Sequence, residues 1–241
     1  MDASHLQELI DLEENYWWHV AKRRLVTSIL TRRFPAPGIV VEGGIGSARN
    51  LVEFQQLGYD VYGLDVMTES VSYAQSRGLE NVFLHDLQQP WPVPTGSAAA
   101  VILLDVLEHI EDPVTVLRHA AKSLRPGGGI IFTVPAYPWL YGDWDRQLGH
   151  YRRYTPALMR EHVAAAGLQV ERLGYWNAFT LPAALAVRFY QKLVPAPRTT
   201  EFPRVSSTFN QLLLGAAAVE RPCARLGLVP CGLSLLGVVH P

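Results

Sequence analysis

A carboxylate and three glycines follow an apolar run in the segment VVEGGIGSARN, residues 40–50. Glu42 precedes Gly43, Gly44 and Gly46, so the main chain here carries little side-chain cover. Glycine allows a ligand to approach the backbone closely, and amides at the start of a helix attract polar or negatively charged groups. The segment therefore predicts a site in which a ligand rests directly on the main chain.

Two familiar phosphate-binding loops do not fit the residues around Gly46. A Walker-type loop requires Gly-Lys-Ser/Thr, whereas Gly46 is followed by Ser-Ala. A dinucleotide fingerprint requires a small residue at position 49, which is occupied by arginine. What remains is an acidic–x–Gly–x–Gly–x–small pattern that starts at Glu42 and ends at Ala48.

Apolar runs and helical stretches alternate around this loop. The runs predict strands at 38–43, 60–66, 81–86, 98–109, 130–135, 168–176 and in the last residues from 231 onward. Strand–helix–strand repetition with short connections predicts an α/β fold with a parallel, doubly wound sheet. Ligands bind beyond the carboxyl ends of the strands in such sheets, which is where the glycine loop lies.

Local signals predict where several helices begin and end. Thr68 or Ser70 is expected to cap a helix that Gly78 terminates. Asp112, which is followed by proline, is expected to open another helix, and Gly167 to close a third.

Composition narrows the class of protein. The chain has 241 residues, a formal charge of −1 and 49% hydrophobic residues, which predicts a globular protein and no nucleic-acid partner. The N-terminus is too acidic and polar for a signal peptide, and no apolar run reaches the ~18 residues of a membrane span. We expect a cytoplasmic protein, either soluble or attached to the membrane surface. Cys223 and Cys231 are expected to be two reduced thiols, with a disulfide between them as the alternative. They lack zinc-site spacing, so no metal site is predicted.

Further motifs follow the glycine loop in a fixed order. Asp65 ends the second predicted strand, 21 positions after Gly44. The later motifs are HDL at 85–87, LLDVLEHIEDP at 103–113 and LRPGGGIIFTVP at 124–135. This succession resembles the class I S-adenosylmethionine-dependent methyltransferases over roughly residues 38–177 and the terminal strand. The resemblance implies a Rossmann-like, mostly parallel seven-stranded sheet with an antiparallel last strand.

The resemblance also implies S-adenosylmethionine as cofactor and assigns residues to it. Glu42 is expected at its amino-acid end, Asp65 at the ribose hydroxyls and Asp86 near the adenine. The other expected cofactor contacts are Gly43, Gly44, Gly46, Val66, Leu87, Asp105, Val106 and Trp18. The alternative for each carboxylate is a structural role in capping or bracing a loop.

Candidate catalytic residues lie beyond the fourth and fifth predicted strands. His109 and His150 could each act as a base, and Tyr154 could shape the acceptor pocket. The alternative is a polar loop whose arginines pair with nearby carboxylates such as Asp145. On the N-terminal helix, Arg23 or its neighbour Arg24 could reach the methionine carboxylate; otherwise this helix only packs.

The whole chain is expected to form one domain. Its segments are an N-terminal helical cap (1–36), a cofactor-binding core (37–177), a helical insertion or lid (178–230) and a final strand (231–241). The apolar insertion could be a lid, a homodimer contact, or a surface for a lipid-linked acceptor or a membrane; ordinary core packing is the alternative.

Two motifs, YWWHVAKRRL and LGHYRRYT, resemble a bacterial subgroup of small-molecule methyltransferases, and more distantly the quinone-pathway O-methyltransferases. We therefore expect methyl transfer to a small molecule, with oxygen favoured over carbon or nitrogen. One alternative is a non-methylating rearrangement or cyclisation on the same fold. Another is a non-catalytic binding protein, suggested by Gly43, Ile45 and Ala48 within the glycine motif. A nicotinamide-dependent oxidoreductase ranks last because of Arg49.

Overall fold

The computed structural model describes residues 3–193 and 205–241. Its strands are β1 (Ile39–Gly43), β2 (Asp60–Asp65), β3 (Val82–Leu84), β4 (Ala98–Leu104), β5 (Leu124–Pro135), β6 (Gln169–Trp176) and β7 (Ser234–His240). They form one sheet in the order β3-β2-β1-β4-β5-β7-β6, in which β7 alone runs antiparallel to its neighbours. The predicted doubly wound sheet with an antiparallel last strand is confirmed.

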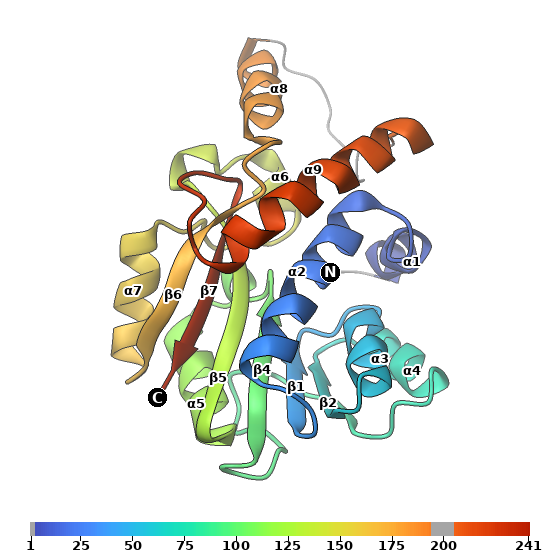
Figure 1. The fold of residues 1–241 in the computed structure, drawn as a ribbon, viewed down its shortest axis with the longest axis vertical. Coiled ribbons are helices and arrows are strands. Elements are labelled where there is room, and N and C mark those ends of the chain that lie inside the picture. Colours follow the sequence, from blue (N-terminus) through green and yellow to red (C-terminus); the bar gives the residue numbers. More distant parts are fainter. Residues whose placement is uncertain (1–2, 194–204) are drawn as a thin grey trace.

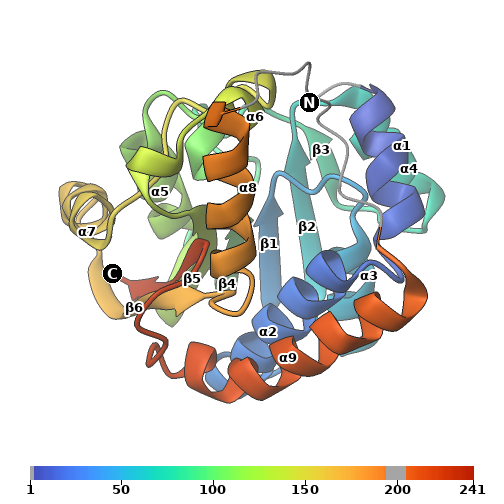
Figure 2. The same ribbon diagram turned by 90° about the horizontal axis from the view of Figure 1, so that it is seen from above.

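Helices cover both faces of this sheet (Figures 1 and 2). They are α1 (Ala3–Leu12), α2 (Trp17–Arg33), α3 (Arg49–Gln56), α4 (Thr68–Ser76), α5 (Pro113–Ser123), α6 (Asp143–Gln147), α7 (Pro156–Ala165), α8 (Leu181–Leu193) and α9 (Ser207–Arg225). Single 3-10 turns span Leu107–His109 and Pro138–Leu140. Helices α2, α3 and α9 lie on one face, and α5 and α7 lie on the other.

The core follows from strands that are apolar on both sides. Every residue of β4 is buried, as a central strand between two helical layers requires. On β1, Val40 packs into the cluster beneath α2, and the next residue, Val41, packs into the cluster beneath α5. The alternation of side chains along a strand therefore supplies both cores.

The predicted helix ends are mostly confirmed. Gly78 and Gly167 adopt positive φ after α4 and α7, and the Asp112 side chain accepts hydrogen bonds from two backbone amides at the start of α5. The predicted cap of α4 by Thr68 or Ser70 is wrong. Met67 holds the cap position, and its N–H donates to Asp65 at 2.9 Å, because the carboxylate at the end of β2 reaches this amide.

The segment between β6 and β7 has two different parts. Helix α8 projects from the body of the molecule, with Val187, Phe189 and Tyr190 more than half exposed (Figure 1). Helix α9 instead lies along α2 and forms part of a helical layer (Figure 2). Within the predicted 178–230 insertion, residues 194–204 lie outside the described part of the chain. Among the described helices, none combines the length and apolarity needed to cross a bilayer.

Candidate active site

The glycine loop after β1 lies between the ends of β2 and β4. Gly44 has a φ of 72° and Gly46 a φ of 51°, values that favour glycine. The Gly44 N–H donates to the Leu64 carbonyl at 2.7 Å. A Cβ added at Gly44 would lie 2.6 Å from a methyl group of Val106, so no side chain fits there without movement. The bare backbone is therefore required by its conformation and by its neighbours.

Glu42 brings an unsatisfied carboxyl oxygen into this loop. The residue is buried, and its Oε1 accepts a hydrogen bond from Asn50 Nδ2 at 2.7 Å. Its Oε2 is buried without a hydrogen-bond partner in the described structure. Burial raises the pKa of Glu42 to about 8. An unpartnered buried oxygen is costly, and a ligand ammonium group would satisfy it, so this position fits the amino-acid end of S-adenosylmethionine.

Asp65 already braces the glycine loop. Its Oδ2 accepts from the Gly46 N–H at 3.1 Å, and its Oδ1 accepts from Met67. Burial raises its pKa, although these amides favour the charged form. Each carboxylate oxygen can accept more than one hydrogen bond, so bracing leaves capacity for ribose hydroxyls. The neighbouring Val66 is 66% exposed, at the edge where a ligand would lie.

The predicted adenine contact, Asp86, follows β3 in a turn. Its Oδ1 accepts from the Gln88 N–H at 2.9 Å, which is the structural role weighed as the alternative. Leu87 is buried, and a Cβ added at Gly43 would lie 3.1 Å from its methyl groups. The contact of Asp86 with adenine stays a prediction.

Asp105, just after β4, is held by a lysine that sequence reasoning missed. Lys22 Nζ on α2 lies 2.6 Å from Asp105 Oδ2, and Thr133 Oγ1 donates to Oδ1 at 3.0 Å. Burial alone would raise the pKa of Asp105, but Lys22 and Thr133 hold it below its usual value. Lys22 is followed by two further basic residues, Arg23 and Arg24, and the sequence does not indicate which of the three faces the end of β4.

The arginines expected near the methionine carboxylate of the cofactor, Arg23 and Arg24, have other surroundings. Arg23 pairs with Glu53 at 3.0 Å and donates to the Glu13 carbonyl at 2.8 Å, and Arg24 is exposed. Successive helical residues differ by about 100° in direction, so Lys22 and Arg23 cannot face the same group.

Trp18 lies one turn before Lys22 on the same helix. Its ring stacks on Trp176 at the end of β6, with centroids 4.9 Å apart, and Lys22 Nζ lies 5.8 Å from the Trp18 ring. The predicted cofactor residue therefore sits beside the Lys22–Asp105 pair. Direct contact of Trp18 with the cofactor remains a prediction.

His109 and His150 are brought together although 41 positions separate them. Their rings meet edge to face with centroids 4.5 Å apart. Burial and the neighbouring His150 lower the pKa of His109 to about 4, so His109 is neutral near pH 7. Glu108, which the sequence reading did not single out, is buried beside them; burial raises its pKa well above the usual value.

These three residues also have the chemistry of metal ligands. One potential ligand atom from each of Glu108, His109 and His150 lies within 4.8 Å of the others. Carboxylate and imidazole groups bind zinc, so the cluster could hold an ion, a use that the sequence did not predict.

A buried carboxylate fixes the orientation of His150. Asp145 on α6 is fully buried, with Oδ1 lying 3.0 Å from His150 Nδ1 and 2.7 Å from Arg153 Nε. Oδ2 accepts from the Gly142 N–H at 2.9 Å and lies 3.5 Å from Arg188 of α8. Burial alone would raise the pKa of Asp145, but His150 and Arg153 lower it to about 2. An ionised carboxylate can only accept, so Nδ1 of His150 donates and Nε2 is left to accept a proton.

Tyr154 does not join the cluster of Glu108, His109, His150 and Asp145. Its side chain is fully buried, and its hydroxyl donates to the Leu107 carbonyl at 3.2 Å. Burial raises its pKa further above the usual value. The placement supports a structural role for Tyr154, which anchors the turn that carries Glu108 and His109, and it argues against the predicted role in the acceptor pocket.

Comparisons with known proteins agree with this geometry. A family described as "Methyltransferase domain" matches residues 16–173. A probable S-adenosylmethionine-dependent methyltransferase of Mycolicibacterium smegmatis is 27% identical over 161 residues, covering 66% of this chain and 62% of the relative. A ubiquinone biosynthesis O-methyltransferase of Marinobacter nauticus is 26% identical over 136 residues, covering 48% and 57%. These matches span about three fifths of the relatives' own length.

A solved structure extends the likeness in fold to nearly the whole chain. The [4+2]-cyclase SpnF has a TM-score of 0.61 at 19% identity, covering 94% of this chain and 86% of its own. The family match, the sheet order and the bare loop beside Glu42 and Asp65 agree with one another. The chain belongs to the methyltransferase-domain family, with the class I fold and the S-adenosylmethionine cofactor that its sequence predicted.

Proposed function

We propose that this protein transfers a methyl group from S-adenosylmethionine to an oxygen atom of a small molecule. The observation that carries the proposal is the Asp145–His150 pair at the end of the sheet that also holds the cofactor residues. An O-methyltransferase relative from ubiquinone biosynthesis supports oxygen as the target. S-adenosylmethionine supplies an activated methyl group on sulfur when bound.

In this proposal some residues hold the cofactor and others transfer a proton from the acceptor. Glu42 Oε2 would accept a hydrogen bond from the cofactor's amino group, and Asp65 would accept from ribose hydroxyls while it braces Gly46. His150 Nε2 would take the proton of the acceptor hydroxyl as that oxygen gains its methyl group. Asp145 keeps Nδ1 protonated and stabilises the imidazolium that forms.

The acceptor in this proposal has an apolar part. Helix α8 exposes Val187, Phe189 and Tyr190, and its Arg188 reaches the carboxylate that orients His150. An apolar or lipid-linked acceptor could therefore lie along α8 with its hydroxyl near His150. Co-sedimentation with phosphatidylcholine vesicles tests the lipid variant; full recovery of protein in the supernatant would remove it.

The direct test is a labelled-methyl assay over hydroxylated aromatic and lipid-like acceptors. Calorimetry with S-adenosylhomocysteine, the demethylated product, runs in parallel. Binding of the product together with labelled acceptor supports the proposal. Binding without label transfer to any acceptor favours a non-methylating rearrangement, the second candidate, for which the cyclase SpnF offers a likeness in fold. Lack of binding favours a non-catalytic protein.

A further inference from the structure

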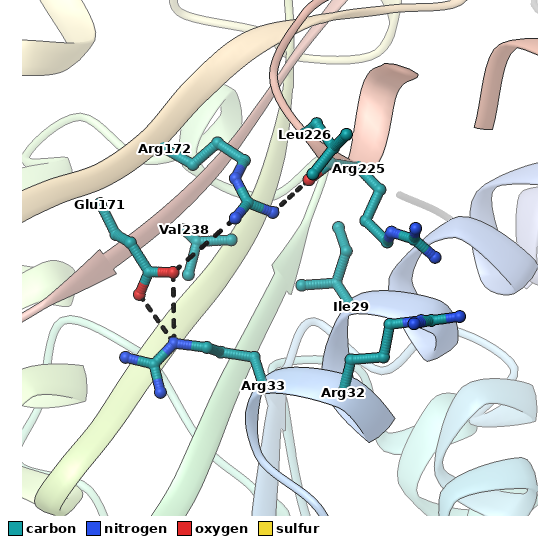
Figure 3. A pocket seen from close by; sticks show the side chains of 8 residues that line it. All are labelled: Ile29, Arg32, Arg33, Glu171, Arg172, Arg225, Leu226 and Val238. Atoms are coloured by element: carbon teal, nitrogen blue, oxygen red, sulfur yellow. Dashed lines mark hydrogen bonds and ion pairs between the residues drawn. The ribbon is translucent and has the colours of Figure 1, made fainter. Parts of the chain in front are cut away.

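A hollow lined by four arginines lies at the carboxyl end of α2 (Figure 3). Neither Glu42 nor the two histidines, His109 and His150, belong to its lining. Its volume is about 230 Å³. Arg32 and Arg33 come from the last turn of α2, Arg172 from the first half of β6 and Arg225 from the end of α9. Strand β6 begins at the amino edge of the sheet, whereas the glycine loop lies at the carboxyl edge. The two sites are therefore separate.

The lining of the hollow includes one carboxylate, that of Glu171, which lies near two of the four arginines. Glu171 Oε2 lies 2.9 Å from Arg33 Nε, and Glu171 Oε1 lies 4.0 Å from Arg172. Arg172 also donates to the backbone carbonyl of Arg225 (Figure 3). The ion pairs fix two of the arginines and leave the lining with a large excess of positive charge.

The other two arginines have no partner of this kind. The guanidinium groups of Arg32 and Arg225 make no hydrogen bond or ion pair with any residue that the structure describes. Arginine stays protonated at physiological pH, so this cluster cannot relieve its repulsion by losing protons. Basic residues are favoured near the carboxyl end of a helix, and this preference explains Arg32 and Arg225 when each is considered separately. It does not account for Arg172 on a strand, or for four such groups around one hollow.

The rest of the lining is apolar. Ile29, Leu226 and Val238 complete the wall of the hollow. The volume is slightly below the ~300 Å³ at which sites for drug-sized molecules begin, so a compact ligand fits best. The lining thus combines an apolar surface with guanidinium forks, which match phosphate oxygens in pairs.

We propose that this hollow binds a compact ligand through a phosphate or diphosphate group. The carbon skeleton attached to that group would lie against Ile29, Leu226 and Val238. The phosphate group would bridge Arg32 and Arg225. Arg172, which lies 4.0 Å from Glu171, would supply a further hydrogen-bond donor. Either a free phosphorylated metabolite or the head group of an anionic phospholipid offers this chemistry.

Calorimetric titration of the full chain with inorganic pyrophosphate tests the site. The double variant Arg32→Gln/Arg225→Gln should weaken pyrophosphate binding about tenfold or more, because both unpaired donors are lost. Arg24→Gln/Arg160→Gln is the matched control, since it removes the same charge from exposed positions on α2 and α7. The control should bind pyrophosphate within about twofold of the unmodified protein. Both variants should bind S-adenosylhomocysteine normally, which checks folding.

Co-sedimentation with vesicles containing phosphatidylglycerol separates the two sources. If the Arg32→Gln/Arg225→Gln variant loses vesicle binding and the control variant retains it, the ligand is a lipid head group. Pyrophosphate binding with the same pattern, without vesicle binding, indicates a free phosphorylated ligand. Absence of both, or equal loss in the cavity and control variants, overturns the proposal. Methyl transfer is measured independently, so neither result decides the function proposed above.

Discussion

Lys22 Nζ lies 2.6 Å from Asp105 Oδ2 and ties the N-terminal helix α2 to the carboxyl end of β4. Asp105 has a φ of 54°, an unusual conformation for a residue with a side chain. The ion pair therefore helps to hold the backbone of Asp105 at this positive φ. Asp105 lies between the glycine loop and the cluster of Glu108, His109 and His150.

Replacing Lys22 with methionine should destabilise the protein by about 1–3 kcal/mol, because the partly buried Asp105 carboxylate would lose its counter-charge. Urea unfolding measures this change. Lys22→Met/Asp105→Asn should recover part of the loss, and Arg24→Met on the exposed side of α2 should have little effect. An equal loss for Lys22→Met and Arg24→Met would contradict the importance of the pair.

Glu42 should make the free protein less stable as the pH rises. Its pKa of about 8 in the folded state exceeds the ordinary 4.5, so the folded state holds a proton that the unfolded state releases. Stability from this group is full below about pH 4.5 and falls until about pH 8, where the loss levels off.

Thermal unfolding from pH 5 to 9 tests this expectation. Glu42→Gln should become more stable than the unmodified protein by a margin that grows up to about pH 8 and then stays constant, while it binds S-adenosylhomocysteine more weakly. Asp60→Asn, exposed at the start of β2, is the control and should show no growing margin. A constant difference between Glu42→Gln and the parent would show that the proton is not held in the folded state.

Gly44→Ala should cost more stability than Gly78→Ala. Both glycines have positive φ, 72° and 82°, so alanine strains both backbones. A Cβ at Gly78 meets nothing within 4 Å, whereas one at Gly44 meets Val106 at 2.6 Å. The expected excess loss at Gly44 is about 1–3 kcal/mol by urea unfolding, with loss of cofactor affinity. Similar losses at both positions would mean that the loop can move away from Val106.

Asp145→Asn and His150→Gln should each lower kcat about 10²–10⁴-fold while changing the affinity for S-adenosylhomocysteine only a few-fold. Asp145→Asn removes the ionised acceptor of the His150 Nδ1 proton, so its pH–rate profile should also change. Asp143→Asn, on the same short helix with a side chain that is 43% exposed, is the control and should keep the parent rate.

Removal of bound metal distinguishes a base from a metal ligand. If His150 acts as a base, prolonged dialysis against a chelator leaves the rate unchanged. Loss of activity on chelation, with recovery on adding zinc, would instead assign His150 to an ion held with Glu108 and His109.

Regular local features made much of the fold predictable. The apolar run that became β4 is buried throughout, and Gly78 and Gly167 end their helices as expected. The cap of α4 could not be predicted from Thr68 or Ser70, because the competing acceptor, Asp65, belongs to the preceding strand. The insertion was predicted as one unit, yet α9 packs on α2 while α8 projects outward.

The sequence by itself determined the family, the doubly wound sheet and the bare loop beside Glu42, because strand periodicity and the need for glycine at positive φ are local properties of the chain. Only the tertiary structure decided that Lys22 pairs with Asp105 while Arg23 pairs with Glu53, and that Asp145 orients His150. It also placed Tyr154 in the core. These relationships join residues on different elements, and which side chains meet there depends on helix rotation and packing.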